Sequence, residues 1–170
     1  MGPPAYHFTA IKYVYRSLSL HVGELIRTAS EKIMCKALDD LHIKFEIFQL
    51  FDFQCGQYFR WSKWEPPKLC LKCNTPLIPK QFARPDIVIT SSDKKRVGVV
   101  RVDGGIHEKK RVKANDFFQT QKFFNNGVMI FIVKNEDIDK RYSPTFQPHA
   151  LALLFKRLLD EPELYDKIYT

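Results

Sequence analysis

Two aspartates and one histidine lie close together in the middle of the chain, in a pattern that suits metal-dependent chemistry. Asp86 opens a short β-branched run and Asp103 closes a second one, with the polar residues 91–95 between them. This composition predicts two antiparallel strands joined by a hairpin loop, so that both carboxylates approach one another at one end of the hairpin. His107 follows just beyond. Carboxylates that converge beside a histidine suit a divalent cation and an activated water.

Each of these residues also has a purely structural explanation. Asp86 follows Pro85 and can simply begin a strand, while Asp103 precedes two glycines and can simply belong to a turn. A single histidine in a basic loop, as His107 is, is more often a surface residue. The three residues together, in the order of helices and strands that surrounds them, favour a functional site.

The elements that must position this hairpin lie on both sides of it. Apolar residues at helical spacing predict helices over residues 25–41 and 114–126, and helical patterns return at 149–159 and 163–168. Strands are predicted over residues 43–50, 86–90, 96–103 and 128–133, the last of them a continuous apolar run typical of a strand buried on both faces. This order predicts an α/β fold with a central mixed β-sheet flanked by helices.

The segment 52–81 interrupts this order and has the composition of a metal-binding insertion. Its cysteines are Cys55, Cys70 and Cys73. The two-residue gap in the Cys-x-x-Cys pair lets both thiolates face one tetrahedral Zn²⁺, whose binding would supply the folding energy that so loop-like a segment lacks. The fourth ligand stays open between Asp52, Cys35 and a histidine from elsewhere, and ordinary free cysteines are the alternative. Trp61 and Trp64 either stack on nucleic-acid bases or cap the zinc-bound loop.

Composition and charge set the bounds on function. The chain of 170 residues fits a single domain, 1–170, and its 45% hydrophobic residues suffice for a core. Its formal charge of +8 favours a polyanionic partner, although many basic proteins bind no nucleic acid.

The chain carries no predicted membrane span or secretion signal. No apolar run approaches the roughly 18 residues of a span, and the amino terminus lacks the apolar stretch of a signal peptide. The four cysteines fit metal binding in a reducing compartment better than a disulfide framework. We therefore expect an intracellular protein that works with DNA in the cytoplasm, nucleoid or nucleus and not in a membrane. The sequence leaves the oligomeric state open, a homodimer included.

Several motifs of the chain resemble a known group of nucleases. They are Arg84-Pro85-Asp86, Val102-Asp103-Gly104-Gly105-Ile106-His107, Asp116 and Gly127-Val128. Together they are similar to the very-short-patch-repair (Vsr) endonucleases and the EDxHD homing endonucleases of the PD-(D/E)xK superfamily. The resemblance spans residues 28–133 approximately. It implies a restriction-endonuclease-like core, to which the zinc-binding insertion is an addition.

The resemblance also implies roles for particular residues. Asp86 and the backbone carbonyl of Val102 would bind Mg²⁺ or Mn²⁺. Asp103 and His107 would act as acid and base, and Glu31 would orient groups at the site or contact the metal through water. A glutamate on the helix surface is the plainer explanation of Glu31, although it shares a stripe with apolar residues. The cations expected to contact DNA phosphates, with a solvated basic face as the alternative, are Lys109, Lys110, Arg111 and Lys113.

Two positions depart from the pattern of these nucleases. Arg101 stands where many of them have a glutamate, and Asp103 stands where the superfamily usually has a lysine. The resemblance therefore implies a histidine-assisted mechanism instead of a lysine-assisted one. The expected function is a metal-dependent DNA endonuclease of repair, junction-resolving or homing type. The alternative is a catalytically inactive DNA-binding protein on the same fold, for which Arg101 is the best argument.

Overall fold

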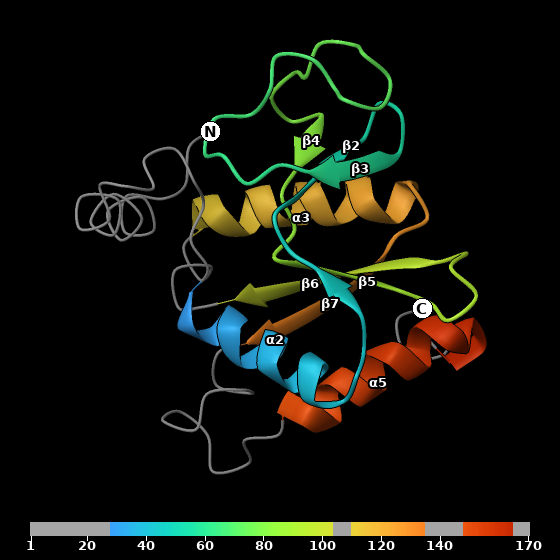
Figure 1. Cartoon of the computed structure of the whole chain (residues 1–170). Helices are drawn as coiled ribbons and strands as arrows, with labels where there is room; N and C mark the ends of the chain where they lie inside the picture. Colours follow the sequence, from blue (N-terminus) through green and yellow to red (C-terminus); the bar gives the residue numbers. More distant parts are fainter. Residues whose placement is uncertain (1–27, 104–109, 135–147, 165–170) are drawn as a thin grey trace.

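The structure, a computed structural model, describes residues 28–103, 110–134 and 148–164 (Figure 1). Its named helices are α2 (Ala29–Asp40), α3 (Lys110–Asn125) and α5 (Pro148–Asp160). Its strands are β1 (Phe45–Glu46), β2 (Gln49–Asp52), β3 (Gln57–Arg60), β4 (Phe82–Ala83), β5 (Ile87–Thr90), β6 (Val97–Asp103) and β7 (Met129–Lys134). The strands form two sheets with helices packed on them, which confirms the predicted α/β fold.

The larger sheet has the strand order β1-β5-β6-β7. Strands β5 and β6 form the predicted antiparallel hairpin, whereas β6 and β7 run parallel and are connected through α3. The sheet is therefore mixed, as predicted, and α3 is its crossover helix. Because β5 and β6 are antiparallel, the start of β5 lies next to the end of β6. The residues that precede β5 therefore lie beside the last residues of β6.

The predicted strand over residues 43–50 is wrong in one respect, because the chain divides it between two sheets. Strand β1 pairs with β5 in the larger sheet, whereas β2 pairs with β3 and β4 in a second sheet of order β3-β2-β4. Between the two halves Phe48 has a φ of 56°, a left-handed conformation that turns the chain and is uncommon for a residue other than glycine. Both halves are rich in apolar residues, so the sequence pattern did not reveal the turn.

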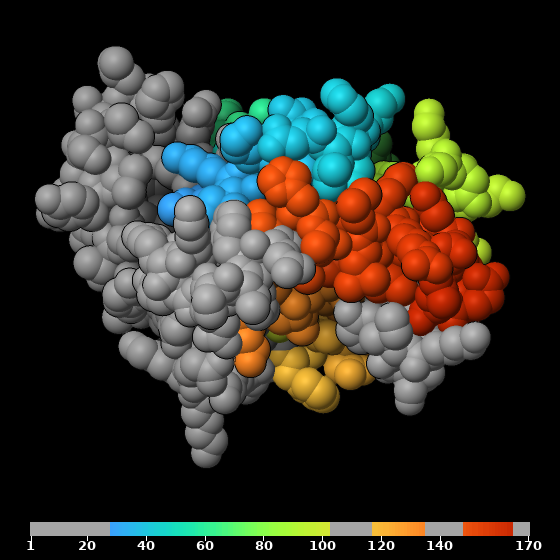
Figure 2. Space-filling model, turned by 90° about the horizontal axis from the view of Figure 1, so that it is seen from below, coloured from blue at the N-terminus to red at the C-terminus, as the bar shows by residue number. Residues whose placement is uncertain are grey.

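One face of the larger sheet is covered by α2 and α5, which lie side by side in Figure 2. The helices are joined where His149 Nε2 lies 3.0 Å from a carboxylate oxygen of Asp40. At the other end of α5, Asp160 accepts a hydrogen bond of 2.7 Å from the backbone N–H of Ser92 in the hairpin loop. The buried residues of this layer are Met34, Cys35, Ala37, Leu38, Ile43, Ile87, Ile89, Val100, Val102, Phe131, Val133, Ala152, Phe155, Leu158 and Leu159.

The other face of the larger sheet packs against α3 and the second sheet. Phe123 of α3 is buried there and contacts the rings of Phe51 and Phe53 edge-on. By contrast, Phe117 and Phe124 are 67% and 61% exposed. The helix also begins earlier than predicted, at Lys110 instead of residue 114.

Thr28 sets the start of α2, which the sequence placed at residue 25. Its backbone is extended, and its hydroxyl oxygen accepts the N–H of Glu31 at 3.2 Å. A side chain that caps in this way satisfies a backbone donor that has no partner within the helix, so the helix begins at Ala29. Residues 25–27 lie outside the described part of the chain. None of the described helices is long and apolar enough to cross a membrane.

Candidate metal centres

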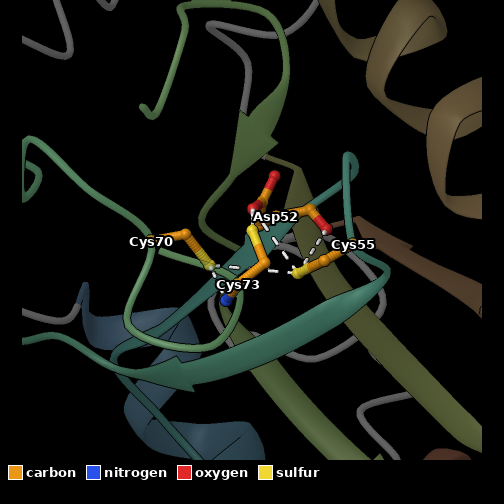
Figure 3. Close-up of side chains that lie close together, drawn as sticks. All are labelled: Asp52, Cys55, Cys70 and Cys73. Atoms are coloured by element: carbon orange, nitrogen blue, oxygen red, sulfur yellow. Dashed lines mark hydrogen bonds between the residues drawn. The ribbon is translucent and has the colours of Figure 1, made fainter. Parts of the chain in front are cut away.

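The insertion gathers three cysteines and one aspartate around a single point. Ligand atoms of Asp52, Cys55, Cys70 and Cys73 all lie within 4.8 Å of one another (Figure 3). Asp52 ends β2, Cys55 lies in the turn that follows, and Cys70 and Cys73 come from the Cys-x-x-Cys turn. We call this group the Cys3Asp cluster. It joins the three predicted zinc ligands to one of the residues considered for the fourth position.

A tight turn between β2 and β3 orients Asp52 and Cys55. The backbone N–H of Gly56 donates to the Asp52 carbonyl at 2.8 Å, and Gly56 has a φ of 72° that glycine adopts without strain. One carboxylate oxygen of Asp52, Oδ1, accepts the N–H of Gln54 at 2.9 Å. The other, Oδ2, lies 3.5 Å from the sulfur of Cys55 and 3.3 Å from that of Cys73. Asp52 thus holds the turn with one oxygen and presents the other to the thiols.

The Cys-x-x-Cys turn aims backbone donors at a sulfur. The N–H groups of Lys72 and Cys73 point to the sulfur of Cys70 at 3.3 and 3.5 Å. The turn is closed by a bond from the Asn74 N–H to the Cys70 carbonyl at 2.9 Å, and Asn74 has the left-handed φ of 60° that asparagine tolerates. N–H groups directed at sulfur stabilise a thiolate, the form in which cysteine binds metals.

Burial and hydrogen bonding act in opposite directions on Asp52. Its side chain is fully buried. Burial raises the pKa of the carboxyl group, but hydrogen bonds from the Gln54 N–H and the surrounding thiols outweigh it, so the net pKa lies below its usual value. Asp52 is therefore a buried carboxylate, and a buried charge requires a compensating charge or strong polar partners.

The three thiols differ in how readily they lose a proton. Burial raises the pKa of Cys55 to about 12 and also raises the pKa of Cys70. Hydrogen bonds with Thr75 lower the pKa of Cys73. A cation that replaces the thiol protons would pair with the thiolates and with the Asp52 carboxylate together.

The donor set of the Cys3Asp cluster fits zinc. Zn²⁺ takes four ligands from sulfur, nitrogen and carboxylate oxygen in a tetrahedron, and the cluster offers one atom from each of four residues. Cys35, another candidate for the fourth position, is instead buried among apolar residues between α2 and the larger sheet. Of the histidines, His42 and His149 are described and neither joins the cluster. The structure thus favours Asp52 as the fourth ligand.

Trp61 is packed beside the cluster. It lies partly buried against Leu50, Phe59 and Cys70, and its indole N–H donates to the Glu65 carbonyl at 2.7 Å. A ring held in this way favours the prediction that Trp61 caps the metal-binding loop over the prediction that it stacks on bases.

The two residues expected to bind Mg²⁺ are also in direct contact. Asp86 lies immediately before β5, and its Oδ2 accepts a hydrogen bond from the backbone N–H of Val102 at 2.8 Å. The resemblance implied a metal contact through the Val102 carbonyl, whose direction follows from the register of the hairpin.

The register of the β5–β6 hairpin shows which backbone groups of β6 face β5. In an antiparallel pair, every second pair of opposite residues exchanges two backbone hydrogen bonds. The N–H of Ser91 donates to the Arg96 carbonyl at 2.9 Å, and counting from there in steps of two along the ladder makes Ile87 and Val100 a bonded pair. The next such pair beyond the end of β5 would be residues 85 and 102.

Residue 85 is a proline, which has no N–H to donate. The Val102 carbonyl, which points to this side of β6, therefore receives no ladder hydrogen bond from Pro85, while the Val102 N–H is bound to Asp86. The Asp86 carboxylate, which is bound to the Val102 N–H, and the Val102 carbonyl are thus on the same side of β6 at the end of the hairpin. Such oxygens are the ligands that Mg²⁺ prefers, with water completing its coordination. We call this pair the Asp86–Val102 site, and Mg²⁺ binding there remains a prediction.

Glu31 lies at the same edge of the core. It is half-buried in the first turn of α2, and Figure 1 shows the first residues of α2 on the side where the arrowheads of β6 and β7 end. Its position also has a structural explanation, because Thr28-x-x-Glu31 is the sequence pattern of a capping box.

Arg101 lies on the α3 side of the sheet. Its Nη1 donates to the hydroxyl oxygen of Thr120 on α3 at 3.1 Å. Continuing the register of the hairpin by one residue beyond Ile87 and Val100 places Arg101 opposite Asp86. The residue that departs from the nuclease pattern is thus a neighbour of the Asp86–Val102 site.

The remaining predicted residues are described in part or not at all. Asp103 is the last residue of β6, and only its backbone is described. His107 and Lys109 lie outside the described residues. The backbone alone is described for Lys110, Arg111 and Lys113, in the first turns of α3. The roles assigned to these residues remain predictions.

No protein-family model, curated protein or solved structure matches the chain closely enough to indicate a relationship.

Proposed function

We propose that this protein is a metal-dependent DNA endonuclease with a restriction-endonuclease-like core. The observation that carries the proposal is the Asp86–Val102 site, where a proline interrupts the ladder beside a carboxylate. The resemblance of the motifs from Arg84 to His107 to the Vsr-like nucleases supports the same function.

The proposed mechanism divides the work among this chain's own residues. Mg²⁺ at the Asp86–Val102 site would supply positive charge for the phosphate oxygens and the leaving group. His107 or Asp103 takes the proton of the attacking water, a task that suits an imidazole near neutral pH. Glu31 orients the water from the start of α2. The basic residues 109–113 bind the DNA backbone, consistent with the net charge of +8.

Replacement of Asp86 tests the proposal. Asp86→Ala should abolish nicking of supercoiled plasmid in Mg²⁺ or Mn²⁺, while DNA binding persists or strengthens because a carboxylate is removed from beside a phosphate. Asp39→Ala, which removes an exposed carboxylate from α2, is the matched control and should cut as the wild type does. If Asp86→Ala cuts plasmid at the wild-type rate, the assignment of the catalytic metal to Asp86 is wrong.

The position of Arg101 favours a second candidate, a DNA-binding protein that has lost cleavage. A guanidinium opposite Asp86 would offset the negative charge that attracts a cation. Binding of mismatched, branched and single-stranded DNAs without nicking in either metal would select this second function. The same panel of DNAs identifies the target if cleavage occurs.

A further inference from the structure

Arg84 bridges two segments that lie far apart in the sequence. Its Nη1 donates to the carbonyl of Trp61 at 3.2 Å, and its Nη2 donates to the carbonyl of Trp64 at 3.1 Å. Because the guanidinium is planar and rigid, two such bonds fix the path of residues 61–64 relative to Arg84. A lysine could not hold both carbonyls in this geometry.

One side of this bridge belongs to the Cys3Asp cluster. Trp61 packs against the buried residues Leu50, Phe59 and Cys70, the last of which is a member of the Cys3Asp cluster. A second connection runs through the sheet, where Asp52 and Phe82 are opposite residues in the β2–β4 pair. Both routes end within a few residues of Arg84.

The other side of the bridge belongs to the Asp86–Val102 site. Strand β4 ends at Ala83 and β5 begins at Ile87, so only Arg84, Pro85 and Asp86 connect the two sheets at this point. Pro85 has a fixed φ, which removes one of the rotations by which the chain could absorb a displacement of Arg84. The position of the Asp86 carboxylate is therefore tied to the position of Arg84.

We propose that Arg84 is a positioning residue through which metal binding at the Cys3Asp cluster strengthens cation binding at the Asp86–Val102 site. The inference rests on the proposed function, because it requires a cation at Asp86. Coupling between two binding sites is reciprocal, so a cation at Asp86 raises the affinity of the cluster for zinc by the same factor. If Arg84 served only to stabilise the fold, the two affinities would be independent of each other.

The test measures Mn²⁺ binding to the zinc-loaded full chain by electron paramagnetic resonance. Arg84→Lys keeps the charge but cannot hold both carbonyls, and it should weaken Mn²⁺ binding by about 5-fold or more, the lower end of typical coupling between sites. Zinc content, measured on the same samples, should stay at the wild-type level. Arg60→Ala removes an exposed arginine from β3 of the second sheet, and this variant should bind Mn²⁺ as the wild type does.

Tryptophan fluorescence supplies a second measurement. The chain has two tryptophans, Trp61 and Trp64, and Arg84 binds the carbonyls of both. Mn²⁺ should change the emission of the wild type, and this change should be smaller in Arg84→Lys. In the wild type, saturating Mn²⁺ should also tighten zinc binding, a comparison that requires no variant and no assumption about its folding.

The outcomes separate this inference from the proposed function. Wild-type Mn²⁺ affinity in Arg84→Lys, or zinc affinity that Mn²⁺ leaves unchanged in the wild type, would overturn the coupling. Asp86→Ala is measured in parallel. If it binds Mn²⁺ as tightly as the wild type, the cation is not at Asp86 and the proposed function loses its metal site. If Asp86→Ala loses Mn²⁺ but Arg84→Lys does not, only the role of Arg84 is wrong.

Discussion

Asp52 combines two roles that the sequence does not separate. Its Oδ1 closes the turn after β2 through the Gln54 N–H, a common arrangement for aspartate in turns. That bond alone would explain an exposed aspartate, but this one is fully buried, with its Oδ2 directed at two thiols. A second role, as a metal ligand, would account for the burial.

Replacing Asp52 by asparagine tests the second role without removing the first. Asp52→Asn keeps a side-chain oxygen for the Gln54 N–H but loses the charge, so zinc affinity should fall by more than about 10-fold, because even groups that only support metal ligands contribute that much. Cys35→Ala is the control, because Cys35 lies in the core between α2 and the sheet. The zinc affinity of this variant should match that of the wild type. Competition with a chromophoric chelator measures both, and equal affinities in all three proteins would exclude Asp52 as a ligand.

In the proposed Asp86–Val102 site, Pro85 acts on a group of another chain segment. Its own atoms need not touch a cation. Its missing N–H is what withholds a ladder hydrogen bond from the Val102 carbonyl across the hairpin. The Pro-Asp pair is thus informative as a unit, whereas Asp86 alone has a plain structural explanation.

At the scale of elements, β6 is the strand that joins the β5–β6 hairpin to β7 in the larger sheet. It pairs with β5 on one side and β7 on the other, and α5 packs across it. Gly98 allows this close approach, because a Cβ there would lie 2.8 Å from a ring carbon of Phe131 and 3.1 Å from a methyl group of Leu159.

Gly98→Ala should therefore destabilise the protein. The backbone of Gly98 is fixed by pairing on both sides, and the added methyl group would displace Phe131 and Leu159, which are fully buried. We expect the free energy of unfolding to fall by about 1–3 kcal/mol, the usual cost of overpacking a core. Urea denaturation measures it, with Lys95→Ala in the exposed hairpin loop as the control. A stability equal to the wild type would show that α5 is not packed as described.

The elements that the sequence predicted well are those with one dominant pattern. The hairpin of β5 and β6 has a polar loop between two β-branched runs, and α5 has apolar residues at helical spacing, so both ends of each were placed within about two residues. The turn at Phe48 was missed because a left-handed φ in an aromatic residue is set by tertiary contacts, which no local pattern encodes. The start of α2 was predicted at residue 25, although Thr28-x-x-Glu31 is a capping signal that would have placed it correctly.

The site residues that could be predicted are likewise those with a local sequence pattern. Cys-x-x-Cys spacing predicted the thiols because the two ligands are local, whereas the choice of Asp52 over Cys35 needed the fold. The apolar residues of the helix predicted over 114–126 gave no indication that Phe117 and Phe124 would be exposed while Phe123 is buried.

At the scale of the whole molecule, the two sheets differ in what stabilises them. The layer between the larger sheet, α2 and α5 is an extended apolar core. The layer around the Cys3Asp cluster has Leu50, Phe59 and Cys70 as its buried apolar residues, a much smaller set, so we expect a metal to contribute to its stability.

Removing zinc should therefore disorder the insertion before the larger sheet. With a chelator, hydrogen exchange should accelerate in residues 53–81 while β5, β6 and β7 stay protected. Acid should act in the same direction, because the pKa values of Cys55 and Cys70 are raised and protons compete increasingly well with metal as the pH falls. Protection of residues 53–81 that is unchanged by chelator would show that the insertion is stable without a metal.

The parallel pairing of β6 with β7 bears on the order in which the chain folds. The strands β2 and β3 are near neighbours in sequence, so their contacts close a short loop. The contacts of β6 with β7 close a loop that contains the whole of α3, and such longer-range contacts carry a larger entropic cost and form more slowly. On a ribosome the metal-binding segment is also synthesised first. The β2–β3 hairpin can thus form ahead of the parallel pairing of β6 with β7.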